Sequence, residues 1–203
     1  MRAPREQFRG LDLEVHAILS DVGLRDVTVV DLPAGGAGRT ISDVRALMAR
    51  GKWMAANPVV RFLFALRLLL GRLFRWDANI HTHQETSYLH RVSADVKRRS
   101  VLAPGSPDGP FGLLYVLERE SLAERRNATV HAFLSLVLIE IPLGYRLYIA
   151  VYVKPVSRLT PLYMALIEPF RRFIVYPALA RGTRRAWEER YPRRLDARAP
   201  DAV

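Results

Sequence analysis

The chain has 203 residues, half of them hydrophobic, and its 31 Lys and Arg against 20 Asp and Glu give a formal net charge of +11. This apolar content excludes an intrinsically disordered chain, because enough surface can be buried to offset the entropy of ordering. The absence of cysteine excludes disulfides, thiolate chemistry and Cys-ligated zinc. The longest uncharged run, Asn127 to Ile139, is too short for a membrane-spanning helix, which needs about 18 residues. Residues 1–10 are polar and Arg-rich with no apolar segment behind them, so we expect no secretory signal and a cytoplasmic protein.

Basic residues are clustered in two segments. Four Arg and no acid lie between Val60 and Trp76, and nine Arg lie between Arg171 and Arg198. Such clusters attract the phosphates of nucleic acids or of anionic lipid surfaces. A solvated basic face is the alternative, and it is the interpretation we favour.

The first elements in chain order are a strand and two helices. The β-branched run at 27–32 predicts a strand that ends at Pro33, followed by a flexible AGGAGR turn at 34–39. The glycines of this turn precede a helix as phosphate loops do, but the spacing matches no phosphate-binding motif, so we interpret the turn as structural. A capping box at Thr40 and Asp43 predicts a helix to about residue 50, and a second helix is expected over about 57–74. Further along, 87–92 suggests a short strand and Ser93 begins a polar helical turn.

A period of two then predicts three consecutive strands over 111–118, 122–139 and 143–154, with a tight turn around Pro142 and Gly144. Short connections between consecutive strands make an antiparallel meander. Both faces of these strands are apolar, so something must cover each side of the sheet: the helices, or a partner subunit in a homodimer.

Thr160 and Pro161 begin a final helix that extends to about residue 191 and bends at Pro169 and Pro177. One side of it is an apolar stripe that can lie across a sheet and includes Leu162, Tyr163, Leu166, Ile167, Phe170, Phe173, Ile174 and Pro177. This order of elements is the α+β helix-grip arrangement: a curved antiparallel sheet wraps a long C-terminal helix, and two helices follow the first strand. We expect an N-terminal extension with a short helix at 1–24, one helix-grip domain at 25–191, and a disordered basic tail at 192–203.

Three runs carry a resemblance to a known family: FGLLYVLERESLAERRNATVH at 111–131, GYRLYIAVYV at 144–153 and LYMALIEPFRRFIVYP at 162–177. They resemble an uncharacterised bacterial family, common in actinobacteria, that looks like part of the START, polyketide-cyclase and pollen-allergen (SRPBCC) superfamily. The likeness covers residues 110–190 well and 25–76 only in pattern. It implies a fold and a ligand-holding cavity, because relatives in that superfamily bind lipids, sterols or polyketides, or cyclise and dehydrate polyketide chains.

His131 is the candidate catalytic residue. It lies in a predicted strand with Asn127, Thr129 and Ser135 on the same face, a polar ladder that is able to hold a carbonyl or hydroxyl group. An imidazole there is suited to acid–base work near neutral pH. The opposite face is more continuously apolar, so the alternative is that the ladder faces solvent or an interface.

The candidate ligand-binding residues come from the strands and the final helix. Arg171 borders the apolar stripe and Tyr163 and Tyr176 flank it, while tyrosines of the sheet are further donors; each is equally interpretable as a half-buried aromatic. The full set is Tyr115, Asn127, Tyr148, Tyr152, Tyr163, Phe170, Arg171 and Tyr176.

Other charged groups favour structural interpretations. Glu118, Glu120 and Glu124 are expected at a charged, solubilising hairpin tip, and Glu168 with Arg172 as an exposed ion pair four residues apart. The histidines at 81, 83 and 90, with Glu85, are weak grounds for a metal site, and nothing suggests a redox cofactor.

The sequence therefore leads to two hypotheses. The first is a protein that encloses a hydrophobic, lipid-like or polyketide-like molecule between the sheet and the bent helix, with cofactor-independent cyclase- or lyase-type proton transfer as the chemistry if it is an enzyme. The second is a peripheral membrane or interaction module that uses its Arg-rich surfaces on an anionic membrane. Nucleic-acid binding is disfavoured, because the basic runs lack interleaved aromatic residues.

Overall fold

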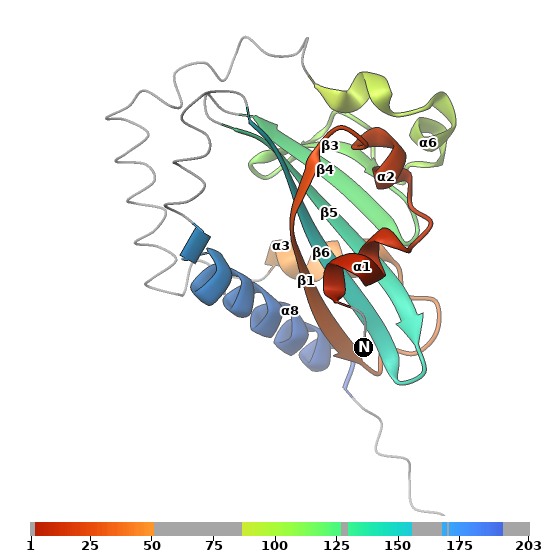
Figure 1. The fold of residues 1–203 in the computed structure, drawn as a ribbon. Helices are drawn as coiled ribbons and strands as arrows, with labels where there is room; N and C mark the ends of the chain where they lie inside the picture. Colours follow the sequence, from red (N-terminus) through yellow and green to blue (C-terminus); the bar gives the residue numbers. More distant parts are fainter. Residues whose placement is uncertain (1–2, 51–86, 127–129, 156–167, 170, 193–203) are drawn as a thin grey trace, which may run out of the picture.

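The computed structural model describes residues 3–50, 87–126, 130–155, 168–169 and 171–192 (Figure 1). A six-stranded antiparallel sheet with the order β1-β6-β5-β4-β3-β2 carries the fold. Its strands are β1 (Gly23–Pro33), β2 (Pro107–Asp108), β3 (Phe111–Val116), β4 (Glu120–Arg126), β5 (Val130–Ile141) and β6 (Gly144–Pro155). The chain is thus an α+β protein with a C-terminal helix, as predicted, and β1 forms one edge of the sheet.

The long β5–β6 hairpin is the centre of the sheet. Ile141 pairs with Gly144 across a two-residue turn, as the sequence predicted. Gly144 has φ +138°, and a Cβ atom there would lie 2.3 Å from the Leu32 carbonyl oxygen. Only glycine therefore allows β1 to approach the hairpin this closely.

Two sequence predictions were wrong in this region. The run expected as one strand over 122–139 forms two strands, since β4 and β5 pair antiparallel with Arg126 opposite His131. A hairpin satisfies the backbone hydrogen bonds of both halves within one sheet, which a single strand of that length does not. Residues 88–91, expected in a strand, form the 3₁₀ helix η2 (Tyr88–Arg91), whose first turn is capped by Ser87.

One face of the sheet is covered by α1 (Pro4–Arg9), α2 (Glu14–Ile18), η2 and α6 (Ala94–Arg99) (Figure 1). The predicted helical turn after Ser93 is α6, and the Ser93 hydroxyl caps it by accepting from the Val96 amide. The main buried side chains on this side are Phe8, Val15, Ile18, Tyr88, Val96, Tyr115, Leu122, Phe133, Val137, Tyr148 and Tyr152. The first 24 residues thus contribute directly to this core.

The opposite face is covered by α3 (Ile41–Arg50) and α8 (Tyr176–Arg190). The predicted capping box is present, because the Thr40 amide donates to the Asp43 carboxylate at 2.9 Å. Trp187 of α8 is fully buried here and donates from its indole nitrogen to the Pro33 carbonyl at 2.9 Å. Both faces are therefore covered, as the apolar strands required; the helix predicted at 57–74 lies outside the described residues.

The last helix begins with an irregular turn. Residues Arg171–Val175 form the π-helical turn η3, and Pro177 lies in the first turn of α8. Proline has no amide hydrogen to donate to the carbonyl four residues earlier, so the regular α-helical bonding is interrupted before Pro177. The wider π-helical turn lies at this interruption, where the sequence predicted a bend. Residues 160–167 of the predicted helix lie outside the described part of the chain. None of the described helices is both long and apolar enough to cross a membrane.

Candidate functional site

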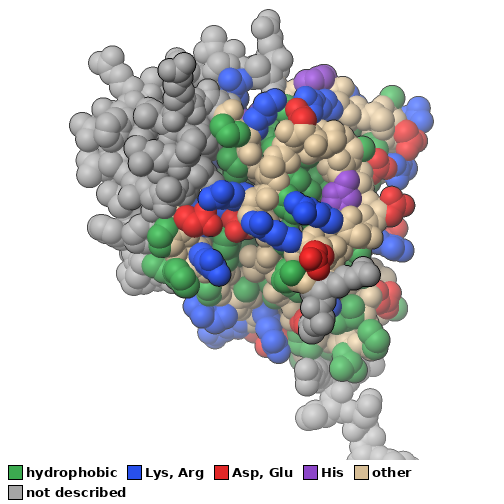
Figure 2. Space-filling model, viewed as in Figure 1, with side chains coloured by type: hydrophobic (Ala, Val, Ile, Leu, Met, Phe, Trp, Pro, Cys, Tyr) green, Lys and Arg blue, Asp and Glu red, His purple; other side chains and the backbone are tan. Residues whose placement is uncertain are grey.

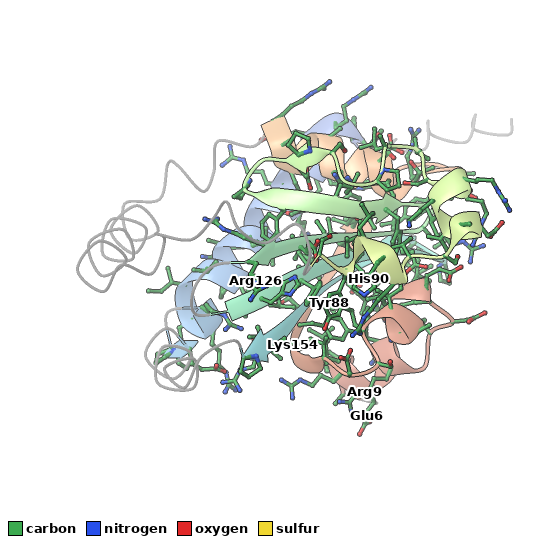
Figure 3. All side chains as sticks on the ribbon, turned by 90° about the horizontal axis from the view of Figure 1, so that it is seen from above. Glu6, Arg9, Tyr88, His90, Arg126 and Lys154 are labelled. Atoms are coloured by element: carbon green, nitrogen blue, oxygen red, sulfur yellow. The ribbon has the colours of Figure 1, made fainter. Side chains whose placement is uncertain are left out.

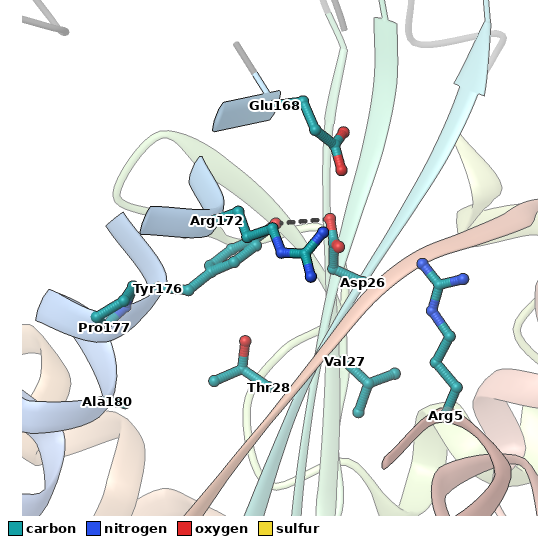
Figure 4. A pocket seen from close by; sticks show the side chains of 9 residues that line it. All are labelled: Arg5, Asp26, Val27, Thr28, Glu168, Arg172, Tyr176, Pro177 and Ala180. Carbon is teal, nitrogen blue, oxygen red and sulfur yellow. Dashed lines mark hydrogen bonds between the residues drawn. The ribbon is translucent and has the colours of Figure 1, made fainter. Parts of the chain in front are cut away.

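A pocket opens between the edge strand β1 and the start of α8. Its volume is about 610 Å³ (Figure 4). Its lining combines charged, hydroxyl and apolar side chains from α1, β1, η3 and α8: Arg5, Asp26, Val27, Thr28, Glu168, Arg172, Tyr176, Pro177 and Ala180. This volume is within the range of about 300–1,000 Å³ that is usual for small-molecule sites.

Two residues of the pocket lining, Asp26 and Tyr176, form a three-residue cluster with Arg171. The Tyr176 hydroxyl donates to Asp26 Oδ2 at 3.0 Å (Figure 4), and Arg171 forms an ion pair with the same oxygen. Arg171 also donates to the Tyr176 hydroxyl oxygen from Nε at 3.0 Å and from a terminal nitrogen at 2.7 Å. The cluster thus fixes the start of the last helix to β1.

The π-helical turn explains why Arg171 and Tyr176 meet. They are five residues apart, and a turn wider than the α-helical one brings side chains at that spacing to the same side. The expected close ion pair between Glu168 and Arg172 does not form, although the charge of Arg172 helps to lower the pKa of Glu168. Glu168 pairs instead with Arg25 of β1 at 2.6 Å, and the hydrogen bond from Arg25 lowers the pKa of Glu168.

The electrostatics of the pocket are set by which charges are paired. Burial raises the pKa of Tyr176, and the neighbouring Asp26 carboxylate adds to this effect. Tyr176 therefore stays protonated at neutral pH and acts as a donor. Arg5 and Arg172 form no ion pair with any described residue, and both are exposed at the pocket rim. The pocket therefore has two exposed arginines at its rim, and its lining also contains the carboxylates of Asp26 and Glu168, which pair with Arg171 and Arg25.

A second polar cluster lies on the opposite face of the sheet, around His131. Residue His131 is 3 % exposed, and its Nε2 lies 2.9 Å from Glu124 Oε2. Its ring stacks on Phe133 at 4.3 Å and meets Tyr88 edge-on at 5.1 Å between centroids. Of the predicted ladder on this strand face, Asn127 and Thr129 lie outside the described residues, and His131 faces a buried core.

Glu124 is held by donors from three directions. Besides His131, it accepts from the Ser87 hydroxyl and, at 3.0 Å, from the Tyr88 amide. Burial by itself would raise the pKa of Glu124, but the hydrogen bonds from His131, Ser87 and the Tyr88 amide outweigh burial and lower it. Tyr88 lies between Lys154 and His90 (Figure 3), and its hydroxyl accepts from Lys154 Nζ at 2.8 Å. The cluster therefore links η2 to the sheet.

Glu120 is the other buried carboxylate of β4. It accepts from the Tyr115 hydroxyl at 3.0 Å and from the Glu14 amide at 2.9 Å, at the first turn of α2. Burial raises the pKa of Glu120, and burial together with the nearby Glu120 charge raises that of Tyr115 well above its usual value. The expected solvated hairpin tip was therefore wrong for Glu120 and Glu124, although Glu118 is exposed. The segments that cover them, α2 and η2, are distant in sequence, so no local pattern marked the burial.

The predicted ligand-binding residues separate into three groups. Arg171 and Tyr176 meet at the pocket. Tyr115, Tyr148 and Tyr152 point to the other face of the sheet, where the Tyr148 hydroxyl donates to Gln7 and burial raises the pKa of Tyr152 to about 12. Asn127, Tyr163 and Phe170 lie outside the described residues.

Sequence reasoning missed Asp26, Thr28 and Arg5. Asp26 and Arg171 are 145 positions apart, and the pairing of β1 with the last helix is not visible as a local motif. Alternation along β1 put Asp26 and Thr28 on one face, but only the position of α8 makes that face a pocket wall.

No metal site is apparent among the described residues, where no three His, Asp or Glu side chains are grouped to bind an ion. His81, His83 and Glu85 lie outside this part of the chain. His90 Nδ1 lies 2.6 Å from the Ser87 carbonyl oxygen.

Comparison with known proteins gives one match. A family model described as "Protein of unknown function (DUF2867)" matches residues 18–178, which include β1, the whole sheet, and the Asp26, Arg171 and Tyr176 cluster. No curated protein and no solved structure matches the chain.

Proposed function

The chain belongs to the DUF2867 family, and we propose that it binds a small amphipathic molecule, with a lipid-like or polyketide-like body and an anionic head, in the pocket between β1 and α8. The observation that carries this proposal is the pocket itself, about 610 Å³ in volume, with the exposed side chains of Arg5 and Arg172 at its rim. Of the predicted ligand-binding set, Tyr176 lines this pocket, and Arg171 bonds to the Tyr176 hydroxyl group.

The lining suits a ligand with two different ends. Val27, Pro177 and Ala180 provide apolar surface, and Arg5 and Arg172 provide positive charge. A guanidinium group binds a carboxylate or phosphate through paired hydrogen bonds. The head of the ligand therefore lies toward Arg5 and Arg172, and its apolar body lies along α8.

We further propose the helix-grip arrangement for this chain. Supporting it are the order strand, helix, antiparallel sheet and C-terminal helix, and the packing of α8 against the sheet. Trp187 and Tyr145 fill the space beneath the C-terminal half of α8, with ring centroids 5.7 Å apart. The ligand space is therefore at the N-terminal end of the helix.

The proposal is for binding, with proton transfer at His131 retained only as a prediction. His131 lies on the opposite face of the sheet from this pocket. Within the pocket, Tyr176 stays protonated because burial raises its pKa, so it acts as a hydrogen-bond donor and not as an acid.

The test is a titration of delipidated protein with the fluorescent fatty acid cis-parinaric acid and with its uncharged methyl ester. We expect saturable 1:1 binding of the acid and weaker binding of the ester. Arg172→Gln should weaken binding of the acid at least threefold, while Arg185→Gln, an equally exposed change on α8 outside the pocket, should not. Equal binding by both variants, or no saturable binding to the wild type, would overturn the proposal.

An anionic membrane surface is the second candidate partner. Phe173 is 72 % exposed, and the Arg172 guanidinium lies 5.9 Å from its ring. Figure 2 shows Lys and Arg side chains gathered across the middle of the face that carries α1, β1 and the start of α8. An exposed aromatic residue beside cations is typical of proteins that lie on a membrane interface.

Vesicle flotation separates this candidate from the first. Binding to phosphatidylserine vesicles at low salt should be lost at high salt and reduced by Phe173→Ser. Leu143→Ser is the matched control, because Leu143 is 84 % exposed at the β5–β6 turn, away from this surface. Binding that is insensitive to salt, or equal loss in both variants, would rule out this surface.

A further inference from the structure

A second pocket lies at the other end of α8, beside the glycine-rich turn that precedes α3. Its volume is about 620 Å³, and its lining consists of Ala34, Gly35, Gly36, Arg39, Arg190, Tyr191 and Pro192. We propose that this pocket is a binding site for a small aromatic carboxylate, separate from the site between β1 and the start of α8.

The glycine-rich turn is fixed in position by Tyr145 and Trp187. The Tyr145 hydroxyl donates to the Gly36 carbonyl at 2.7 Å and accepts from the Arg39 amide at 3.1 Å. A Cβ atom at Gly35 would lie 2.6 Å from the Trp187 ring, so the backbone packs directly on that ring. The turn therefore provides a pocket wall that is already in place before a ligand binds.

The other side of the turn is open. Gly36 has φ +71°, and a Cβ atom there would meet nothing within 4 Å. A backbone without side chains presents a flat surface against which an aromatic ring can pack. Such a surface, next to Tyr191, suits a planar ligand.

Two guanidinium groups converge on Tyr191. Arg39 lies 4.4 Å and Arg190 5.3 Å from the centroid of the Tyr191 ring. Arg39 uses its Nε to bond the Gly35 carbonyl at 2.7 Å, and neither arginine forms an ion pair with a described residue. Asp43, which contacts Tyr191, accepts from the Tyr191 hydroxyl at 3.1 Å and from the Thr40 amide.

The chemical class of the ligand follows from this combination. Two unpaired guanidinium groups, with no carboxylate in the lining, select an anion, and their planar donors match the two oxygens of a carboxylate. The glycine surface and the Tyr191 ring select a flat apolar body of limited size. An arginine that already lies over an aromatic ring also needs little reorganisation to bind.

The test uses benzoate, with benzamide and acetate as comparison probes, in ¹H–¹⁵N spectra of the full chain. Benzoate should shift the amide signals of Gly35, Gly36 and Gly38 saturably. Benzamide lacks the charge and acetate lacks the ring, so both should bind at least tenfold more weakly. Equal shifts from benzamide, or benzoate shifts confined to residues 176–180, would overturn the proposal.

Substitutions of Arg39 and Arg190 test whether benzoate binding depends on their positive charges. The double change Arg39→Gln with Arg190→Gln should weaken benzoate binding at least tenfold, and Arg190→Gln alone at least threefold. Arg190 is exposed, so the single variant keeps the test valid if the loss of Arg39 disturbs the turn. Arg184→Gln, on the exposed face of α8, is the control and should bind like the wild type. Unchanged binding in Arg190→Gln and the double variant would overturn the site, and cis-parinaric acid binding tests the first pocket independently.

Discussion

Two polar clusters in this protein have similar chemistry but different surroundings. Glu124 with His131 and Asp26 with Arg171 are each a carboxylate joined to a nitrogen base and a hydroxyl group. The side chains of Glu124 and His131 are 12 % and 4 % exposed, whereas those of Asp26 and Arg171 are 24 % and 14 % exposed beside a pocket. A buried cluster mainly holds elements together, while a half-exposed one at a pocket is also able to meet a ligand.

The largest expected effect is from Glu124→Leu. This change leaves His131, the Ser87 hydroxyl and the Tyr88 amide without their acceptor in a buried site. Removing one partner of a buried pair costs about 3–5 kcal/mol, so the free energy of unfolding should fall by about that amount. Urea unfolding followed by circular dichroism measures this loss. Glu118→Leu, at an exposed position nearby, is the control and should change stability by about 0.5 kcal/mol or less; a similar loss in both would contradict a special role for the cluster.

The two buried carboxylates of β4 should respond to pH in opposite directions. The folded-state pKa of Glu120 is raised above 4.5, so its contribution to stability is present at low pH and is lost as pH rises through that raised pKa. The folded-state pKa of Glu124 is lowered, so its contribution is present above pH 4.5 and is lost as pH falls through that lowered pKa.

Urea unfolding from pH 3 to pH 7, an interval of about 2 units either side of a carboxyl pKa, tests this contrast. In the wild type, ionisation of Glu120 lowers stability as pH rises, and Glu120→Gln should abolish that decrease. Protonation of Glu124 lowers stability as pH falls, and Glu124→Gln should abolish that decrease. Each effect should be smaller than that of Glu124→Leu, because glutamine keeps an acceptor and a similar shape. Difference profiles of the same sign would contradict the assigned directions.

A smaller effect is expected at the pocket cluster. Tyr176→Phe removes the hydrogen bond to Asp26, so unfolding should become easier by about 0.5–1.5 kcal/mol. It should also weaken cis-parinaric acid binding severalfold, because Tyr176 lines the pocket and its hydroxyl group bonds to both Asp26 and Arg171. Tyr148→Phe removes one phenol hydrogen bond, to Gln7, on the opposite face, and should alter stability alone. If Tyr148→Phe weakens binding as much as Tyr176→Phe, the pocket is misassigned.

The smallest effect is expected where a charge pair is exposed. Arg184 and Glu188 of α8 are 52 % and 47 % exposed and lie 2.9 Å apart. Glu188→Gln should reduce stability by only about 0.3–0.5 kcal/mol, and by less near 1 M salt, where the Debye length is about 3 Å. Thermal unfolding at low and high salt measures it. If Glu188→Gln lowers stability as much as Tyr176→Phe does, then an exposed pair contributes as much to stability as a partly buried cluster, and the expected difference between them is wrong.

Local features of the fold were predictable from the sequence. The capping box at Thr40 and Asp43, the turn before Gly144 and the bend at Pro177 depend on residues close together in the chain. The alternating strands also showed that both faces of the sheet had to be covered. The division of 122–139 into β4 and β5 was missed, because both halves alternate in the same way and only the pairing of Arg126 with His131 separates them.

The candidate site was only half predictable. The apolar stripe of the last helix pointed to Arg171 and Tyr176, but the stripe contains no sign of Asp26, which is 150 positions from Tyr176. The same limit applies to Glu120 and Glu124, which look like surface charges until the Glu14 amide, Tyr115, Ser87 and His131 are brought to them.

By itself, the sequence determined most of the elements, their order and the need to cover both faces of the sheet, because backbone propensity and the alternation of apolar residues act over a few positions. Only the tertiary structure decided which face each tyrosine occupies, which carboxylates are buried and where the pockets lie. The physical reason is that burial and hydrogen bonding depend on the groups that surround a side chain in space, and several of those groups, such as Glu14 beside Glu120 and Asp26 beside Tyr176, are more than a hundred residues apart in the chain.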